Sequence, residues 1–135
     1  MKPTSDQLGE ELTTLIDPDT TPALRSIVGY TPETYTIQFI RDDVAAQYND
    51  DDVVAAIDEL RLETISHDQT NSVFQGIHGE FECRVNVFAN AVVYQFGSDG
   101  GLGVEIAFDG RWLAARDARV GDLGQFLDER PQYRQ

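Results

Sequence analysis

The carboxyl half of the chain consists of short apolar segments separated by residues that are typical of tight turns. Every second residue from Phe81 to Val87 is apolar, which is the period of a strand with one buried face. Two further apolar segments follow at 92–96 and 102–108, and the run Gly97–Gly101 between them is typical of a hairpin turn. Because strands joined by such short turns pair antiparallel, this half of the chain predicts an antiparallel sheet.

The amino half contributes a second pair of strands. Tyr35, Ile37 and Phe39 alternate with polar residues, which predicts a strand at this position. An apolar segment at 23–30 precedes it, and the connecting tetrad Thr31–Thr34 contains a proline and is typical of a turn. We therefore predict a β-hairpin.

Other apolar residues recur at helical spacing. Val53, Ile57 and Leu60, extended by Leu62, form one apolar stripe whose opposite face is acidic. The polar stretch 66–79 has no such pattern and is predicted to be a loop. The segments predicted to be helical are 5–16, 44–48, 49–65 and 112–127.

These elements follow the order α–ββ–α–βββ–α when the two middle helical stretches are counted together. The expected fold class is therefore α+β, with a single five-stranded antiparallel sheet covered by helices. A length of 135 residues with 41% hydrophobic side chains suffices for one packed core. We expect residues 1–130 to form this single domain, and residues 131–135 to form a disordered tail.

Acidity dominates the composition, because 24 Asp and Glu residues stand against 10 Lys and Arg residues, a formal net charge of −14. Self-repulsion of this size destabilises a compact state in dilute buffer, whereas at molar salt the screening length falls to about 3 Å. The charge therefore predicts a protein adapted to high salt. It also argues against nucleic acids and anionic membranes as partners, since these are bound through clustered Lys and Arg.

Membrane insertion and secretion are not expected. No apolar run approaches the roughly 20 residues that span a bilayer, and residues 1–11 lack the basic and apolar regions of a secretory signal. Cys83 is the single cysteine, so an intramolecular disulfide is excluded. The expected location is the cytoplasm.

Two resemblances extend this interpretation. The run Ala23–Tyr30, followed by Ile40–Val44 and Asp58–Glu63, resembles small acidic haloarchaeal proteins of unknown function. This resemblance covers most of the chain and implies a halophilic cytosol but no activity. The element order is similar to the roadblock/longin/profilin-like group, and Val120–Leu127 resembles the glycine-punctuated start of the last roadblock helix.

The roadblock resemblance implies a partner and an interface. Domains of that kind dimerise through the middle helix and the strand after it, which form a continuous sheet across the two copies. Carried over to this chain, the resemblance implies a homodimer, with a Ras-like GTPase or another cytosolic protein as a further partner. The interface residues that it implies are Val53, Ile57, Leu60, Phe81, Val85 and Val87.

Two groups of residues are candidates for metal binding. The run Asn49–Asp52 lacks the glycine and the glutamate that follow in a calcium-binding EF-hand loop, and acids at a helix start are favoured by free backbone N–H groups. His67, His78 and Cys83 are separated by 11 and 5 residues, which matches no compact zinc motif. We expect helix capping in the first case, and a buried structural cysteine with two loop histidines in the second.

Two further segments are candidates for phosphate binding and for acid–base catalysis. The glycine-rich segment 97–103 lacks the Lys-Ser/Thr of a phosphate-binding loop, so a turn that needs positive φ explains its glycines better. Glu80 and Glu82 lie on one strand face, which is ordinarily solvated. The aromatic residues suited either to the core or to an interface are Tyr30, Tyr35, Tyr94 and Trp112.

The sequence therefore predicts a non-catalytic interaction or regulatory module, with no catalytic residue, cofactor or metal. The alternative from another functional class is a small-ligand sensor, which would hold a metabolite between the sheet and the first or last helix. A metal-dependent hydrolase would require His67 and His78 to converge with acidic side chains.

Overall fold

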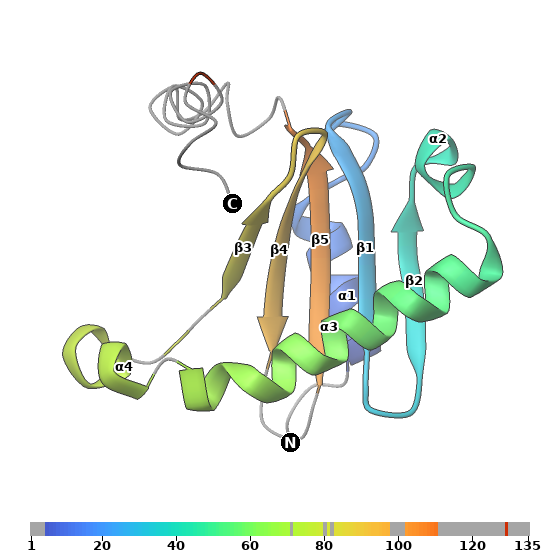
Figure 1. Cartoon of the computed structure of the whole chain (residues 1–135). Coiled ribbons are helices and arrows are strands. Elements are labelled where there is room, and N and C mark those ends of the chain that lie inside the picture. Colours follow the sequence, from blue (N-terminus) through green and yellow to red (C-terminus); the bar gives the residue numbers. More distant parts are fainter. Residues whose placement is uncertain are drawn as a thin grey trace.

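The computed structural model describes residues 5–70, 72–79, 81, 83–97, 102–110 and 129. Within these ranges the chain forms one open five-stranded antiparallel sheet with the strand order β2-β1-β5-β4-β3 (Figure 1). The strands are β1 (Leu24–Tyr30), β2 (Tyr35–Ile40), β3 (Arg84–Val87), β4 (Ala91–Gly97) and β5 (Gly103–Asp109). The helices are α1 (Ser5–Leu15), α2 (Asp42–Ala45), α3 (Asp50–Thr70) and α4 (Ser72–His78). The predicted α+β class and element order are confirmed, whereas the predictions for 112–127 and 131–135 lie outside the described residues.

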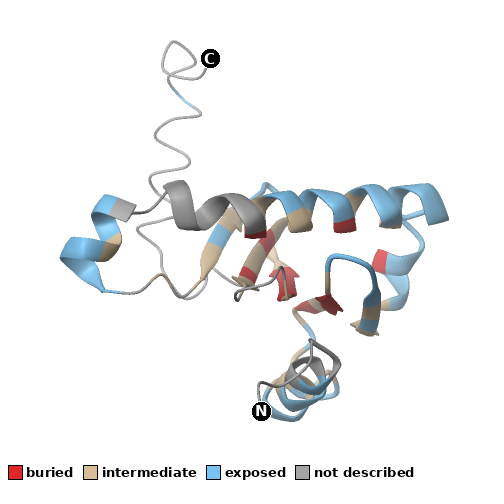
Figure 2. Ribbon diagram, turned by 90° about the horizontal axis from the view of Figure 1, so that it is seen from below, coloured by how far each residue is buried: buried red, intermediate tan, exposed pale blue. Residues whose placement is uncertain are grey.

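Helices cover both faces of this sheet. Viewed from below, α1 lies on one side of the strands and α3 crosses the other (Figure 2). On the α1 face, Leu12 and Ile16 pack against a cluster of buried sheet residues, in which Ile27 and Val104 are fully buried. On the α3 face, Val28 and Tyr30 pack against Ile57, Val53 and Leu60. The central strand β5 is therefore buried from both sides.

The predicted hairpin of β1 and β2 is present and carries an irregularity. The backbone N–H of Thr31 donates to the Thr34 carbonyl oxygen, which closes the turn. Further along, Phe39 pairs with Ile27 but Ile37 pairs with Val28, because the register shifts between Ile27 and Val28. Since consecutive residues of β1 face opposite sides, Ile37 and Phe39 lie on opposite faces despite their alternating spacing.

The start of α3 explains the acidic run of the sequence. Asn49 Oδ1 accepts a hydrogen bond from the Asp52 N–H at 2.8 Å, and Asp52 Oδ2 accepts one from the Asn49 N–H at 3.1 Å. This reciprocal pair is a capping box, so the predicted helix-capping role is confirmed for these two residues. Farther along the helix, the predicted stripe of Val53, Ile57 and Leu60 does face the sheet, but Leu62 is 68% exposed and does not belong to it.

The segment 66–79 was predicted to be a loop, and this prediction is wrong. Helix α3 continues to Thr70, and α4 follows from Ser72 to His78. The packed amino-terminal turns of α3 supply the costly nucleus, after which each added residue contributes one more backbone hydrogen bond. A helix extended in this way needs no apolar stripe of its own.

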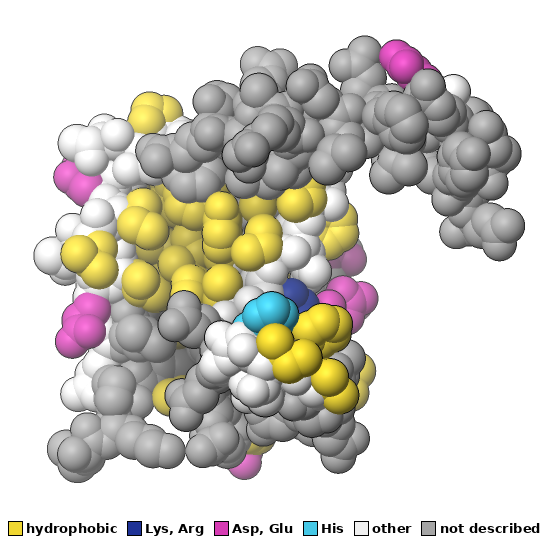
Figure 3. All heavy atoms as spheres, turned by 90° about the vertical axis from the view of Figure 1, so that its left-hand side faces the viewer, with side chains coloured by type: hydrophobic (Ala, Val, Ile, Leu, Met, Phe, Trp, Pro, Cys, Tyr) yellow, Lys and Arg dark blue, Asp and Glu magenta, His cyan; other side chains and the backbone are white. Residues whose placement is uncertain are grey.

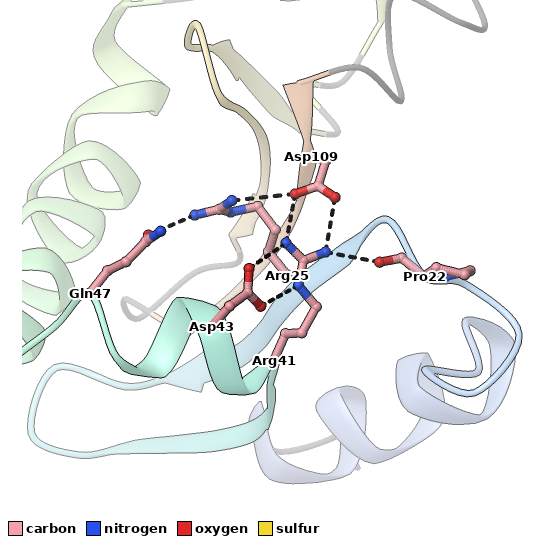
Figure 4. Close-up of polar contacts among 6 residues, drawn as sticks. All are labelled: Pro22, Arg25, Arg41, Asp43, Gln47 and Asp109. Carbon is pink, nitrogen blue, oxygen red and sulfur yellow. Dashed lines mark hydrogen bonds and ion pairs between the residues drawn. The ribbon is translucent and has the colours of Figure 1, made fainter.

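A cluster of ion pairs connects the end of β2, the start of α2 and the end of β5 (Figure 4). The guanidinium of Arg41, at the end of β2, contacts both carboxylate oxygens of Asp109 at 2.9 Å and those of Asp43 at 2.6 and 3.0 Å. Its remaining N–H donates to the Pro22 carbonyl oxygen at 2.8 Å, so all five donors are used. Hydrogen bonding to Arg41 lowers the pKa of Asp109 and that of Asp43.

We expect Arg41→Lys to reduce the free energy of unfolding by about 1–2 kcal/mol, because an ammonium cannot form two bidentate contacts at once. The partial exposure of the cluster keeps the loss at this modest level. Chemical denaturation in molar KCl measures it. Arg84→Lys in β3 is the matched control because Arg84 takes no part in the cluster, and an equal loss in both variants would contradict this role for Arg41.

Candidate functional site

A groove of about 350 Å³ lies between α3 and the sheet. Helix α3 covers the groove and is positioned by Arg61. The Nε and Nη2 atoms of Arg61 donate to the carbonyl oxygens of Thr31 and Thr34 at 2.7 and 3.1 Å. These bonds hold α3 to the β1–β2 turn. The aliphatic and Phe side chains that line the groove are Val28, Ile37, Ile40, Val44, Val53, Ala56, Ile57, Leu60, Phe88, Ala91, Val93 and Ala107.

The groove contains one buried carboxyl group, that of Glu105. This residue belongs to β5, where it pairs with Val28 of β1 on one side and Gln95 of β4 on the other. It is only 9% exposed, and the Ser26 hydroxyl lies 3.0 Å from Oε1 and 3.3 Å from Oε2. Burial raises the pKa of Glu105 to about 7, against the opposing effects of the Ser26 hydrogen bond and the Arg25 charge.

The other charged residues of the groove are mostly acidic. Glu59 and Glu63 of α3 line it, the first exposed and the second half-buried. Arg25 also lines it, but its guanidinium is held by Asp109 at 3.3 Å and by Gln47 Oε1 at 3.0 Å (Figure 4). The groove therefore combines apolar walls, a buried acid and a negative rim.

A buried polar cluster adjoins the groove and fixes the distance between α3 and the sheet. Gln95 Nε2 lies 2.7 Å from the Leu60 carbonyl oxygen, 2.8 Å from Tyr30 Oη and 2.9 Å from Thr64 Oγ1. Tyr30 Oη and Thr64 Oγ1 are themselves 2.7 Å apart. Burial raises the pKa of Tyr30, so its hydroxyl stays protonated.

Two glycines make room for this cluster. Gly97 and Gly103 pair with each other across β4 and β5, and Gly103 also pairs with Tyr30. A Cβ atom on Gly103 would lie 2.2 Å from Tyr30 Cζ, and one on Gly97 would lie 2.8 Å from Thr64 Cγ2. Neither glycine has positive φ, so the prediction that a turn requires glycine at these two positions is wrong. Glycine is required here because neighbouring side chains leave no room for a Cβ atom.

The six residues of the expected interface fall into two groups. Val53, Ile57 and Leu60 face inward and line the groove, and Ile57 is only 4% exposed. Val85 and Val87 lie on the edge strand β3 and are 44% and 57% exposed. Phe81 is partly buried and precedes β3, which begins only at Arg84, so the predicted strand start at 81 is wrong. Whether these residues contact a partner stays a prediction.

The metal-site candidates are not brought together in the described part of the chain. His78 stacks on Phe74 of the same helix with ring centroids 6.1 Å apart, and Cys83 is partly buried just before β3. The side chain of His67 lies outside the described residues, as do Glu80 and Glu82. Among the residues that are described, no three His, Cys, Asp or Glu side chains gather as metal ligands would.

The aromatic candidates divide between core and surface. Tyr30 is fully buried, and Tyr94 packs edge-on against Phe108 with ring centroids 5.7 Å apart. Tyr35 is 42% exposed, and Trp112 lies outside the described residues. Core packing is therefore confirmed for Tyr30 and Tyr94, and an interface role for Tyr35 stays a prediction.

Sequence reasoning missed Glu105, although a signal was present. It is the single charged residue within the otherwise apolar segment 102–108, which was correctly predicted to be a strand. A lone acid in a strand buried on both faces is a stronger indication of a site than paired acids on a half-exposed strand, because burial of a charge is costly.

Exposed apolar side chains gather on the β3 side of the molecule, in one group over the sheet and another on α4 (Figure 3). On the sheet edge, Phe88 is 59% exposed beside Val85 and Val87. On α4, three apolar side chains are 61–71% exposed. These are Val73, Phe74 and Ile77. Contiguous exposed apolar surface is a feature of protein contact sites.

Comparison with known proteins gives one match. The family model described as "Domain of unknown function (DUF7522)" matches residues 10–128. No curated protein and no solved structure matches the chain. In the described part of the chain, no helix has both the length and the apolar character needed to cross a membrane.

Proposed function

The chain belongs to the DUF7522 family of domains of unknown function, and from the geometry of its groove we propose that it binds a small organic ligand between α3 and the sheet. The observation that carries this proposal is the groove of about 350 Å³ with the buried carboxyl group of Glu105 in its wall. The sequence predicted such a ligand between the sheet and the first or last helix, whereas the groove proposed for it lies against α3.

The composition of the groove supports binding of a ligand more than of a protein segment. Small-molecule sites are mostly apolar concavities of roughly 300–1,000 Å³ with a few polar groups that orient the ligand. The walls here are mainly Val, Ile, Leu and Ala side chains, and Glu105 with Ser26 supplies the polar contact. A carboxyl group whose pKa is raised by burial is a further feature of functional sites.

The test uses Nile red, a neutral apolar dye, titrated against the protein in molar KCl. We expect saturable fluorescence enhancement with the wild-type chain. Ala56→Trp places an indole in the groove and should weaken binding at least about tenfold, which is a loss of about 1.4 kcal/mol.

Ala55→Trp is the matched control, because Ala55 neighbours Ala56 on α3 but is exposed. Circular dichroism establishes that both variants are folded. Equal binding by the two variants, or no saturable binding by the wild-type chain, would count against a ligand-binding groove.

A second candidate function is self-association of a halophilic, roadblock-like interaction module, and one observation favours it. Val85 and Val87 are exposed on β3, which is an edge strand whose outer backbone groups have no neighbouring strand in the described sheet. Antiparallel pairing of two β3 edges would bury these valines and extend the sheet across a homodimer. A Ras-like GTPase or another cytosolic protein would be a further partner of such a module.

Light scattering after size-exclusion chromatography in molar KCl tests this second candidate. A dimer that dissociates in Val85→Glu/Val87→Glu but persists in Val54→Glu, a control on the exposed side of α3, would support it. A strict monomer at all concentrations would rule it out.

A further inference from the structure

We propose that the ligand of the groove is an amphiphilic amine, whose protonated nitrogen lies against the Glu105 carboxylate and whose apolar part lies along α3. This inference rests on the proposed function and names the ligand class. Its first support is the hydrogen bonding of Glu105. An ionised carboxylate offers about four acceptor positions, and among the described residues the Ser26 hydroxyl is the donor that contacts it.

The second support is the location of that carboxylate. Glu105 lies in the wall of the groove beside Ser26 and Ala107, while apolar side chains of α3 face it from the helix side. A buried acid is stabilised most by a partner that brings both a positive charge and N–H donors. An ammonium group supplies the positive charge and the N–H donors, and an apolar chain attached to it would pack against the apolar side chains of the groove.

The third support is the balance of charge around the groove. Glu59 and Glu63 add two carboxylates on the α3 side, whereas Arg25 is already held by Asp109 and Gln47. A carboxylate or phosphate ligand would meet three acids, and the Arg25 guanidinium is already paired with the Asp109 carboxylate. A neutral alcohol would leave the Glu105 charge unpaired.

Binding of such a ligand depends on pH in a defined direction. The groups that face Glu105 are Ser26 and Arg25 of β1, Gln95 of β4, and Glu59 and Glu63 of α3, with Tyr30 nearby. Because the pKa of Glu105 is raised to about 7, the carboxyl must lose its proton before it can pair with an ammonium. Affinity should therefore fall up to about tenfold per pH unit as the pH is lowered below 7.

The experiment compares three probes that share one apolar chain: hexylammonium, 1-hexanol and hexanoate. Their binding is measured by isothermal titration calorimetry at pH 8 in molar KCl with the folded full-length chain. We expect hexylammonium to bind at least about tenfold more tightly than hexanol, and hexanoate to bind most weakly. Glu105→Gln should abolish the preference for the amine while hexanol binding persists. Glu10→Gln, at an exposed glutamate of α1 that does not line the groove, should retain the preference.

The outcomes separate this inference from the proposed function. Equal affinities for hexylammonium and hexanol would overturn the amine assignment while leaving a ligand-binding groove. Retention of the full preference in Glu105→Gln would overturn the amine assignment in the same way. If none of the three probes binds and Nile red also fails to bind, both the amine assignment and the proposed function are overturned.

Discussion

Gly103→Ala is expected to lower the melting temperature by roughly 10 °C, which corresponds to a loss of about 3 kcal/mol in the free energy of unfolding. The added methyl group would lie 2.2 Å from Cζ of Tyr30 and 2.3 Å from its hydroxyl oxygen. Tyr30 is fully buried and hydrogen-bonded to Thr64, so its ring cannot move without disturbing the contact between α3 and the sheet. Thermal denaturation in molar KCl measures the effect.

Two further variants make this prediction specific. Gly76→Ala in α4 is the matched control, because a Cβ atom there meets nothing within 4 Å, and helix propensity should make the change neutral or slightly stabilising. In a Tyr30→Leu background the ring is removed, so Gly103→Ala should cost much less than in the wild type. An unchanged cost in that background would show that overlap with the Tyr30 ring is not the cause.

Glu105→Gln is expected to stabilise the protein by about 3 kcal/mol at pH 8. The wild-type carboxyl is ionised at this pH in both the folded and the unfolded chain, and burial of its charge opposes folding. Glutamine has nearly the same shape and carries no charge, so that cost is removed. The variant also retains a side-chain acceptor for the Ser26 hydroxyl.

The pH dependence of this effect has a definite sign. The pKa of Glu105 is raised from 4.5 to about 7 in the folded protein, so between these values the unfolded chain is ionised while the folded chain holds its proton. Over this range the contribution of Glu105 to stability falls as the pH rises, and above pH 7 the loss is complete. The difference between variant and wild type should therefore be small at pH 4.5 and should grow up to pH 7.

Chemical denaturation at several pH values between 4.5 and 8 measures this difference directly. Glu59→Gln is the control, since Glu59 is an exposed glutamate of the same groove. It should change stability little and with no such dependence on pH. A constant difference between Glu105→Gln and wild type across the range would mean that Glu105 does not bear the cost of burial.

Local patterns were sufficient wherever a residue's structure depends on its neighbours in the chain. The spacing of Val53, Ile57 and Leu60 predicted the face that α3 turns to the sheet. The polar pair Asn49 and Asp52 predicted the helix start, because a cap is formed within three residues. Alternation and turn residues likewise predicted the strands and, from them, the α+β class.

Those patterns failed where distant segments decide the outcome. The opposite orientation of Ile37 and Phe39 follows from a register shift against β1, which the alternation of β2 does not contain. The helical residues 66–70 have no apolar stripe of their own, and they continue α3, whose preceding turns are packed on the sheet. A ligand site was predicted at the first or last helix, whereas the groove lies against α3. The sequence pattern of a helix does not indicate how closely that helix will pack on the sheet.

The amino-acid sequence by itself determined the α+β class, the order of the elements and the acidic surface, because periodicity, capping and charge act over short stretches of chain. Tertiary structure alone decided that Glu105 lies beneath α3 with Ser26 as its donor, and that Tyr30 occupies the space left by Gly103. The physical reason is that pairing register and helix placement bring together residues as far as 84 positions apart, and burial acts only after they meet.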